Sequence, residues 1–183
     1  MSENHQIQQA AKIIQNGGVI SYPTESVFGL GCDPLNESAV NKILRLKNRA
    51  VEKGLIIVAG DLIQLKPYIE ISAEEEQKLL ADKSDTTWLI KKSPLTPNWV
   101  SGKHEKVAVR VSKHPLIVKL CQIINQPLIS TSANPAGSAP ATDSQQSNHY
   151  FSNNIDLYID YKIKGTGQPT QIKDITTDFV IRE

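Results

Sequence analysis

The sequence of 183 residues predicts an α/β fold in which helices flank a twisted sheet that is mixed and mostly parallel. Short runs of β-branched and aliphatic residues alternate along the chain with segments whose apolar residues recur every three or four positions. The run at residues 55–59 is apolar throughout, which fits a strand covered by helices on both faces of the sheet. We find no internal repeat and no linker, so we expect a single domain over residues 1–183.

The first half of the chain opens with an amphipathic helix around residues 7–14, which a glycine pair ends. A short strand at residues 19–22 stops at Pro23, because proline has no N–H to give to a sheet. Residues 24–34 are expected to form a loop with a second short strand. The next expected elements are a helix at 37–47, the strand at 55–59, a short helix after Asp61, and a helix from Ser72 towards Ala81 that the capping box of Ser72 and Glu75 begins.

The second half continues the alternation of strands and helices. We expect a strand at 86–91, a long loop at 93–104 that carries Trp99, a strand at 107–111, a helix from Pro115 to Ile124, and a strand at 127–130 that leads into S-T-S-A-N. Residues 141–154 are rich in Ser, Gln and Asn, which predicts a mobile surface segment. The ends at 157–163 and 177–181 have strand-like composition, and we expect short terminal strands that pair antiparallel.

The composition excludes several classes of protein. The 20 Lys and Arg against 19 Asp and Glu give a net charge of +1, so an anion site must be a local cluster of cations. The N-terminus lacks the features of a leader peptide and no apolar run reaches membrane-spanning length, which predicts a cytoplasmic protein without membrane contact. Cys32 and Cys121 are the only cysteines, and we expect two reduced, half-buried thiols. The four histidines are scattered, so no metal site in the protein is expected.

The familiar nucleotide and nucleophile motifs are missing. The chain has no G-x-x-x-x-G-K-[ST], no third glycine after Gly29 and Gly31, and no G-x-S-x-G. The hydroxyls of Ser130, Thr131 and Ser132 therefore have little claim to be nucleophiles. They follow a strand, where hydroxyls and backbone N–H groups can bind a phosphate or a ribose. An ordinary turn or helix-capping cluster is the alternative.

Lys47, Arg49 and Lys53 form the densest group of cations outside the loops. On one interpretation, Lys47 and Arg49 complement the negative C-terminal end of the preceding helix. On the other, they bind a polyphosphate, for which a lysine point charge beside an arginine fork is well suited. Residues two apart do not share a helix face, so both cations point to one place only if the helix ends between them.

Arg110 is the one charged residue in the strand V-A-V-R-V. It either lies at the edge of the sheet in solvent or directs its guanidinium towards an anion over the sheet, because a buried charge needs a partner. The sequence alone leaves both alternatives open.

Five motifs, Y-P-T-E-S-V-F-G-L-G, K-N-R, K-G-L-I-I-V-A, V-A-V-R-V and S-T-S-A-N, occur in this order. Together they resemble the YrdC-like family, and in particular its short bacterial threonylcarbamoyl-AMP synthases. The resemblance extends from the first helix to about residue 140. It implies a sheet curved around a basic concave cavity.

The resemblance also implies an activity. Such an enzyme is a nucleotidyltransferase that converts L-threonine, bicarbonate and ATP, with Mg²⁺, to threonylcarbamoyl-adenylate and pyrophosphate. The product serves the formation of N6-threonylcarbamoyladenosine at position 37 of tRNA. Weak tRNA binding and contacts with other proteins of tRNA modification are the further partners that the resemblance implies.

The resemblance assigns roles to residues that match the motifs of the family. The K-x-R pair falls on Lys47 and Arg49, as catalytic and nucleotide-binding residues, and S-x-N falls on Ser132 and Asn134. The other matching positions are Lys53 and Ser130 on the nucleotide side, and Thr24, Arg110 and Thr87 on the threonine side.

Two departures from the family pattern stand out. D-K-S-D-T-T replaces a W-P-G-P-x-T segment, so a rigid turn before Thr87 is lost, and Ala50 stands where a proline often follows K-x-R.

Two other functions remain as alternatives. One is a non-catalytic module that binds tRNA or ribosomal RNA on a basic concave surface, against which the near-neutral charge argues. The other is a carbamoyl-phosphate-dependent relative, against which the lack of an acylphosphatase-like or zinc-finger segment argues.

Overall fold

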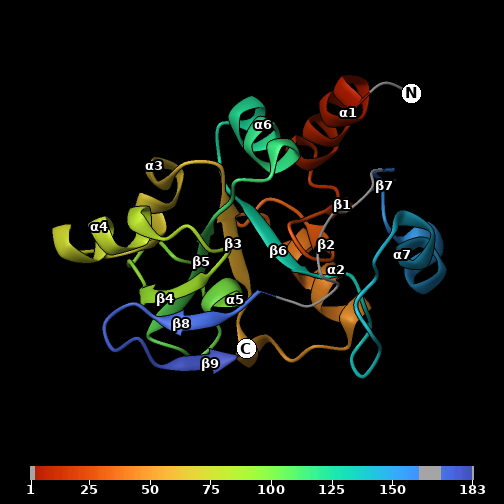
Figure 1. The fold of residues 1–183 in the computed structure, drawn as a ribbon. Helices are drawn as coiled ribbons and strands as arrows, with labels where there is room; N and C mark the ends of the chain where they lie inside the picture. Colours follow the sequence, from red (N-terminus) through yellow and green to blue (C-terminus); the bar gives the residue numbers. More distant parts are fainter. Residues whose placement is uncertain (1–2, 161–169, 183) are drawn as a thin grey trace.

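The computed structural model describes residues 3–160 and 170–182 (Figure 1). The helices are α1 (Glu3–Gln15), α2 (Glu37–Lys47), α3 (Leu62–Leu65), α4 (Ala73–Ala81), α5 (Asn98–Ser101), α6 (Pro115–Ile124) and α7 (Ser144–Phe151), with 3-10 turns η1 (Val51–Lys53), η2 (Lys66–Tyr68) and η3 (Ser152–Asn154). The strands are β1 (Ile20–Pro23), β2 (Phe28–Gly31), β3 (Ile56–Ala59), β4 (Thr87–Lys91), β5 (Lys106–Val111), β6 (Leu128–Ser132), β7 (Leu157–Tyr158), β8 (Ile172–Asp174) and β9 (Val180–Arg182).

The described strands form one mixed sheet in the order β7-β1-β2-β6-β3-β5-β4-β8-β9. The pairs β1–β7, β3–β5 and β4–β8 are parallel, and the other five pairs are antiparallel. The mixed sheet is confirmed, but the expected majority of parallel pairs is wrong, because β6 enters between β2 and β3 and runs against both.

The terminal strands agree with the prediction in part. The last strand, β9, pairs antiparallel with β8 as expected, whereas β7 pairs parallel with β1 at the opposite edge of the sheet. The sequence reading missed β8, and the part of the predicted strand at 161–163 lies outside the described residues.

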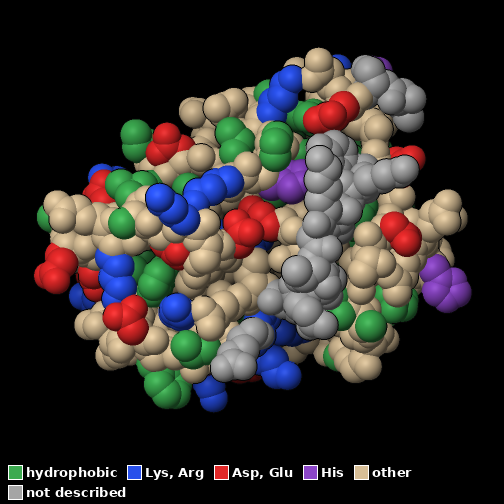
Figure 2. Space-filling view, in the orientation of Figure 1, with side chains coloured by type: hydrophobic (Ala, Val, Ile, Leu, Met, Phe, Trp, Pro, Cys, Tyr) green, Lys and Arg blue, Asp and Glu red, His purple; other side chains and the backbone are tan. Residues whose placement is uncertain are grey.

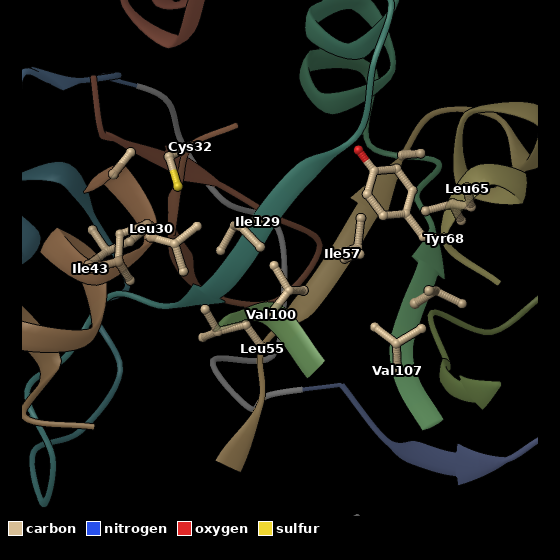
Figure 3. Packing of buried hydrophobic residues seen from close by; sticks show 14 of the residues in the cluster. Leu30, Cys32, Ile43, Leu55, Ile57, Leu65, Tyr68, Val100, Val107 and Ile129 are labelled. Carbon is tan, nitrogen blue, oxygen red and sulfur yellow. The ribbon is translucent and has the colours of Figure 1, made fainter. Parts of the chain in front are cut away.

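Helices cover both faces of the sheet, as the apolar run at 55–59 predicted. Successive residues of a strand face opposite sides, so Val58 packs with α1 and α6, whereas Ile57 packs with α2 and α5 on the other face. Figure 3 shows this second cluster, in which Ile57 and Ile129 of neighbouring strands lie near Leu30 and Val100. Residues far apart in the sequence thus hold the centre of the sheet rigid beside the cavity described below.

Two loop predictions were wrong. The segment 93–104 contains α5, and residues 141–154 contain α7, which Asp143 begins by accepting a hydrogen bond from the Gln146 amide. Phe151 is buried, and the Ser147 hydroxyl lies 2.7 Å from that of Ser21 in β1. Only a narrow stripe of α7 faces the protein, so its composition stays polar although the helix is packed.

Both cysteines are fully buried, so the expectation of half-buried thiols was wrong. Burial raises the pKa of the Cys121 thiol to about 12 and also raises the pKa of the Cys32 thiol. In the described part of the chain, no helix is long and apolar enough to cross a membrane.

Gly31 lets the β1–β2 hairpin lie close to β6. A Cβ at this position would lie 2.6 Å from Cε1 of Tyr22 and 2.9 Å from the Ile129 carbonyl oxygen. We therefore expect Gly31→Ala to lower the free energy of unfolding by about 1–3 kcal/mol through overpacking, measured by urea unfolding. Gly137→Ala is the matched control, because nothing lies within 4 Å of a Cβ there. Its positive φ of 84° alone should cost about 1 kcal/mol, and an equal loss in both variants would contradict steric crowding at Gly31.

Candidate active site

A cavity of about 470 Å³ lies where the β1–β2 turn, η1, β5, β6 and the C-terminal strands meet. Six of the predicted site residues line it: Thr24, Arg49, Lys53, Arg110, Ser130 and Ser132. Lys47, Asn134 and Thr87 are not among the lining residues. On the face in Figure 2, Lys and Arg side chains gather along the lower part, near a hollow at the centre.

The end of α2 turns Lys47 and Arg49 towards the same region. The helix stops at Lys47 because Asn48 adopts the left-handed conformation, with φ of 48°, and its N–H bonds back to the last turn. The helix therefore ends between the two cations, as the polyphosphate interpretation required. The Arg49 guanidinium donates from Nε and Nη2 to the Gly54 carbonyl at 3.2 and 2.9 Å. Partial burial lowers the pKa of Arg49, and the fork is fixed at the cavity wall.

Lys47 holds the turn that follows β6. Its buried ammonium donates to the carbonyls of Ser132 and Asn134, the second at 2.8 Å, and lies 3.4 Å from the Asn134 side-chain oxygen. The Lys47 carbonyl also accepts from the Ala136 amide at 2.9 Å. Burial, and then the charge of Arg49, lower the pKa of Lys47 to about 8. Lys47 thus acts on the cavity through the Ser132–Asn134 turn.

Asn134 completes this clamp from inside the turn. Its side-chain amide donates to the Ser138 carbonyl at 2.7 Å, while its oxygen faces Lys47. Both ends of the side chain are therefore used by the protein, whereas Ser130 and Ser132 line the cavity. S-x-N supplies one lining hydroxyl and one residue that shapes the turn.

Thr24 lies at the start of the β1–β2 turn. Its hydroxyl donates to the Val27 carbonyl at 2.7 Å, and the side chain is buried at the cavity wall. A Cβ on Gly29 would lie 3.2 Å from Cγ2 of Thr24 and 3.6 Å from Oγ of Ser130. Gly29 therefore lets Thr24 and Ser130 approach each other across the sheet.

Arg110 is buried, which answers the question that the sequence left open. Nη2 lies 3.3 Å from a carboxylate oxygen of Glu25, and Nη1 donates to the Thr170 hydroxyl at 2.8 Å. The Thr170 hydroxyl is in turn 3.2 Å from that of Thr87. Thr87 therefore reaches the site only through Thr170, and Arg110 is an ion-paired residue of the cavity wall.

The structure adds cavity residues that the sequence reading missed. Among them are Lys106, Thr170 and Arg182. Lys106 is four residues before Arg110 on the same strand, so the alternation of side chains could have placed both on one face. Arg182 donates to the Thr170 carbonyl at 2.7 Å, and its pKa is lowered by burial and then by the charges of Arg110 and Arg49. The charges of Arg110 and Arg49 thus reach Arg182 across this cavity.

Hydrogen bonds between side chains and the backbone hold the D-K-S-D-T-T segment in a turn before β4. Oδ1 of Asp82 accepts from the Ser84 amide at 2.8 Å, and the Ser84 hydroxyl lies 2.6 Å from that of Thr86. Thr86 and Thr87 are buried after this turn. The start of β4 is therefore held by these hydrogen bonds and by burial.

The Sua5_yciO_yrdC family model, which bears the description "Telomere recombination", matches residues 12–183. The chain belongs to this family. The matched residues of this Sua5/YciO/YrdC family member include all five motifs found in the sequence.

Curated relatives and solved structures agree with this membership. A threonylcarbamoyl-AMP synthase of Pseudoalteromonas atlantica is 48% identical over 171 residues, which are 91% of each chain, and one of Pseudomonas aeruginosa is 44% identical over 100% of this chain and 99% of its own. P. abyssi Sua5, solved in complex with L-threonine, matches with a TM-score of 0.88 and 30% identity over 95% of this chain. This chain spans about half of that Sua5, 52% of its length. E. coli YciO matches with a TM-score of 0.81 and 26% identity over 100% of this chain and 90% of its own.

Proposed function

We propose that this chain is a threonylcarbamoyl-AMP synthase, which converts L-threonine, bicarbonate and ATP to threonylcarbamoyl-adenylate and pyrophosphate. The observation that carries the proposal is the cavity that Arg49, Arg110 and Arg182 share with the hydroxyls of β6. Relatives of nearly equal length at 44–48% identity bear the name of this activity. The non-catalytic RNA-binding module is the less supported function.

The reaction needs positioning and charge more than it needs a protein nucleophile. The threonine amine takes up the carbon of bicarbonate as a carbamate, with loss of water. A carbamate oxygen then forms a bond to the α-phosphorus as the bond from that phosphorus to the departing pyrophosphate breaks. Fixed cations that face the developing charge supply most of the acceleration in such a transfer.

The cavity residues divide into two groups for this chemistry. Arg49, Lys53 and Arg182 would neutralise the triphosphate, with Lys47 and Asn134 holding the turn that carries Ser132. Thr24, Ser130 and Arg110 are buried residues of the cavity wall and would hold threonine. Thr87 would support this end through Thr170.

Mg²⁺ would enter as the chelate of ATP. Among the described residues, no three His, Cys, Asp or Glu side chains are grouped so that they could hold a metal ion, and Glu105 is the only carboxylate among the described lining residues. A lining with a single carboxylate fits an ion that is held by the phosphate oxygens of ATP. The ion would supply positive charge that offsets the charge developing on the leaving group.

The product would serve threonylcarbamoylation of adenosine at position 37 of tRNA, which places the proposed reaction in the cytoplasm. We include weak tRNA binding and contacts with other proteins of that modification in the proposal. Cations at the cavity mouth support only a local nucleic-acid contact, because the whole chain is nearly neutral.

The test is pyrophosphate release by the purified protein. We expect release from ATP only when threonine and bicarbonate are both present, with threonylcarbamoyl-adenylate detected by mass spectrometry. Release that is indifferent to threonine would contradict the assignment. A salt-dependent affinity for RNA without turnover would favour the binding module.

A further inference from the structure

Glu25 is a buried carboxylate to which the proposed chemistry gives no role. It follows Thr24 in the β1–β2 turn, and its side chain is 7% exposed against 5% for Arg110. One carboxylate oxygen faces Nη2 of Arg110 at 3.3 Å, and the other accepts from the Ser112 hydroxyl.

Arg110 lines the cavity, whereas Glu25 and Ser112 are not among its lining residues. The carboxylate therefore lies behind the arginine as seen from the cavity.

The hydrogen bonds of Ser112 fix the direction of this contact. Its hydroxyl oxygen accepts from the His114 amide at 3.1 Å, so its only proton is left for Glu25. Ser112 directly follows β5, and its own amide is held by the Ala59 carbonyl at 2.8 Å. The carboxylate is thus braced by a residue that two neighbouring strands hold in place.

The contacts with Glu25 and Thr170 use only part of the hydrogen-bonding capacity of Arg110. Nη1 donates to Thr170 and Nη2 faces Glu25, while buried Nε has no hydrogen-bond partner within residues 3–160 and 170–182. A guanidinium has five N–H groups in a rigid fork, so two fixed contacts orient the remaining donors. An unpartnered buried donor is costly to a folded protein, so stability alone does not explain this orientation of Arg110.

We propose that Glu25 and Ser112 are positioning residues, which hold the Arg110 guanidinium in the orientation that receives the anionic group of the amino-acid substrate. This inference rests on the proposed function. Stability alone explains the pair poorly, because replacing a buried ion pair by apolar residues is often neutral or stabilising.

Glu25→Gln tests the proposal, because it keeps the shape and an acceptor for Ser112 but removes the charge. We expect the KM for threonine to rise about tenfold and the KM for ATP to stay within about twofold. Calorimetric titration with threonine alone should show the same loss of affinity. Ser112→Ala should raise the KM for threonine about threefold. Ser112→Thr, which keeps the hydroxyl, should restore the wild-type KM.

A double variant separates positioning from a general structural role. If Glu25 acts through Arg110, adding Glu25→Gln to Arg110→Lys should change the KM for threonine by less than about twofold. Glu76→Gln is the matched control, because it breaks an exposed ion pair with Lys66 outside the cavity and should change neither KM. Equal rises in both KM values, full additivity in the double variant, or a lower melting temperature with unchanged threonine affinity would each overturn the proposal. A wild-type protein without threonine-dependent release would instead overturn the proposed function.

Discussion

Arg49→Ala is expected to lower kcat/KM for pyrophosphate release about 10²- to 10³-fold, because removal of one preorganised donor to developing charge typically has this effect. In the structure, Nε and Nη2 of Arg49 are anchored on the Gly54 carbonyl, so the fork is already in place at the cavity before a nucleotide binds. No reorganisation is needed at the moment of reaction. Release assayed at saturating threonine and bicarbonate measures the loss.

The chain offers a matched control on the same helix. Arg45 lies in the last turn of α2 and is exposed, so Arg45→Ala removes an equal charge outside the cavity and should keep kcat/KM within about twofold. Arg49→Lys should recover only a small part of the activity, since an ammonium cannot make the two contacts to Gly54 and also reach a phosphate. Equal losses in Arg45→Ala and Arg49→Ala would show that total charge, and not the anchored fork, matters.

Much of the fold could be predicted because its signals are local. The capping box of Ser72 and Glu75 begins α4 as expected, with both hydrogen bonds present. The apolar run around Ile57 becomes a central strand, and α2 ends at Lys47 as the pair of cations required. In each case a few neighbouring residues determine the conformation, so the sequence pattern carries the information.

The missed features depend on distant contacts. The helix α7 is held by buried Phe151 and by Ser147 against β1, and neither contact is visible in a polar segment. Thr170 and Arg182 reach the cavity only because β8 pairs with β4 and then with β9. Composition cannot show which strand a short C-terminal segment will join, so the C-terminal part of the site was absent from the prediction.

Lys47 illustrates a different limit of the sequence. The motif identified the residue, but it could not show that the ammonium would be buried against the Ser132 and Asn134 carbonyls rather than exposed at the cavity. Two neighbouring cations look alike in a sequence. Burial and hydrogen-bond partners separate Arg49, which faces the cavity, from Lys47, which holds the turn beside it.

Lys47→Met is therefore expected to act on both stability and nucleotide binding. It keeps the apolar stem but removes the ammonium donor from two half-buried carbonyls of the turn, of which that of Ser132 also accepts from a backbone amide, so the free energy of unfolding should fall by about 1–3 kcal/mol. The loosened turn carries Ser132, so the affinity for ATP should also fall by at least about tenfold. Urea unfolding and equilibrium nucleotide binding measure the two effects separately.

The pH dependence of nucleotide affinity tests whether the charged ammonium of Lys47 supports nucleotide binding. The pKa of Lys47 is lowered from its ordinary value to about 8, so raising the pH from 7 to 9 removes most of its charge from the empty protein. Phosphates favour the charged form, so nucleotide binding above pH 8 must take up a proton, and the affinity of the wild type should fall with pH through this range. Binding is measured with nucleotide alone, because the threonine amine also titrates above neutral pH.

Stability should change in the opposite direction. Between about pH 8 and the ordinary pKa of lysine, 10.5, the unfolded chain holds a proton on Lys47 that the folded chain has lost. The contribution of this group to the free energy of unfolding therefore rises with pH in this window. The stability of the wild type relative to Lys47→Met should grow with pH while its advantage in nucleotide affinity shrinks. Parallel pH profiles of the two proteins would contradict this account, because only a lysine buried in the turn couples the two quantities with opposite signs.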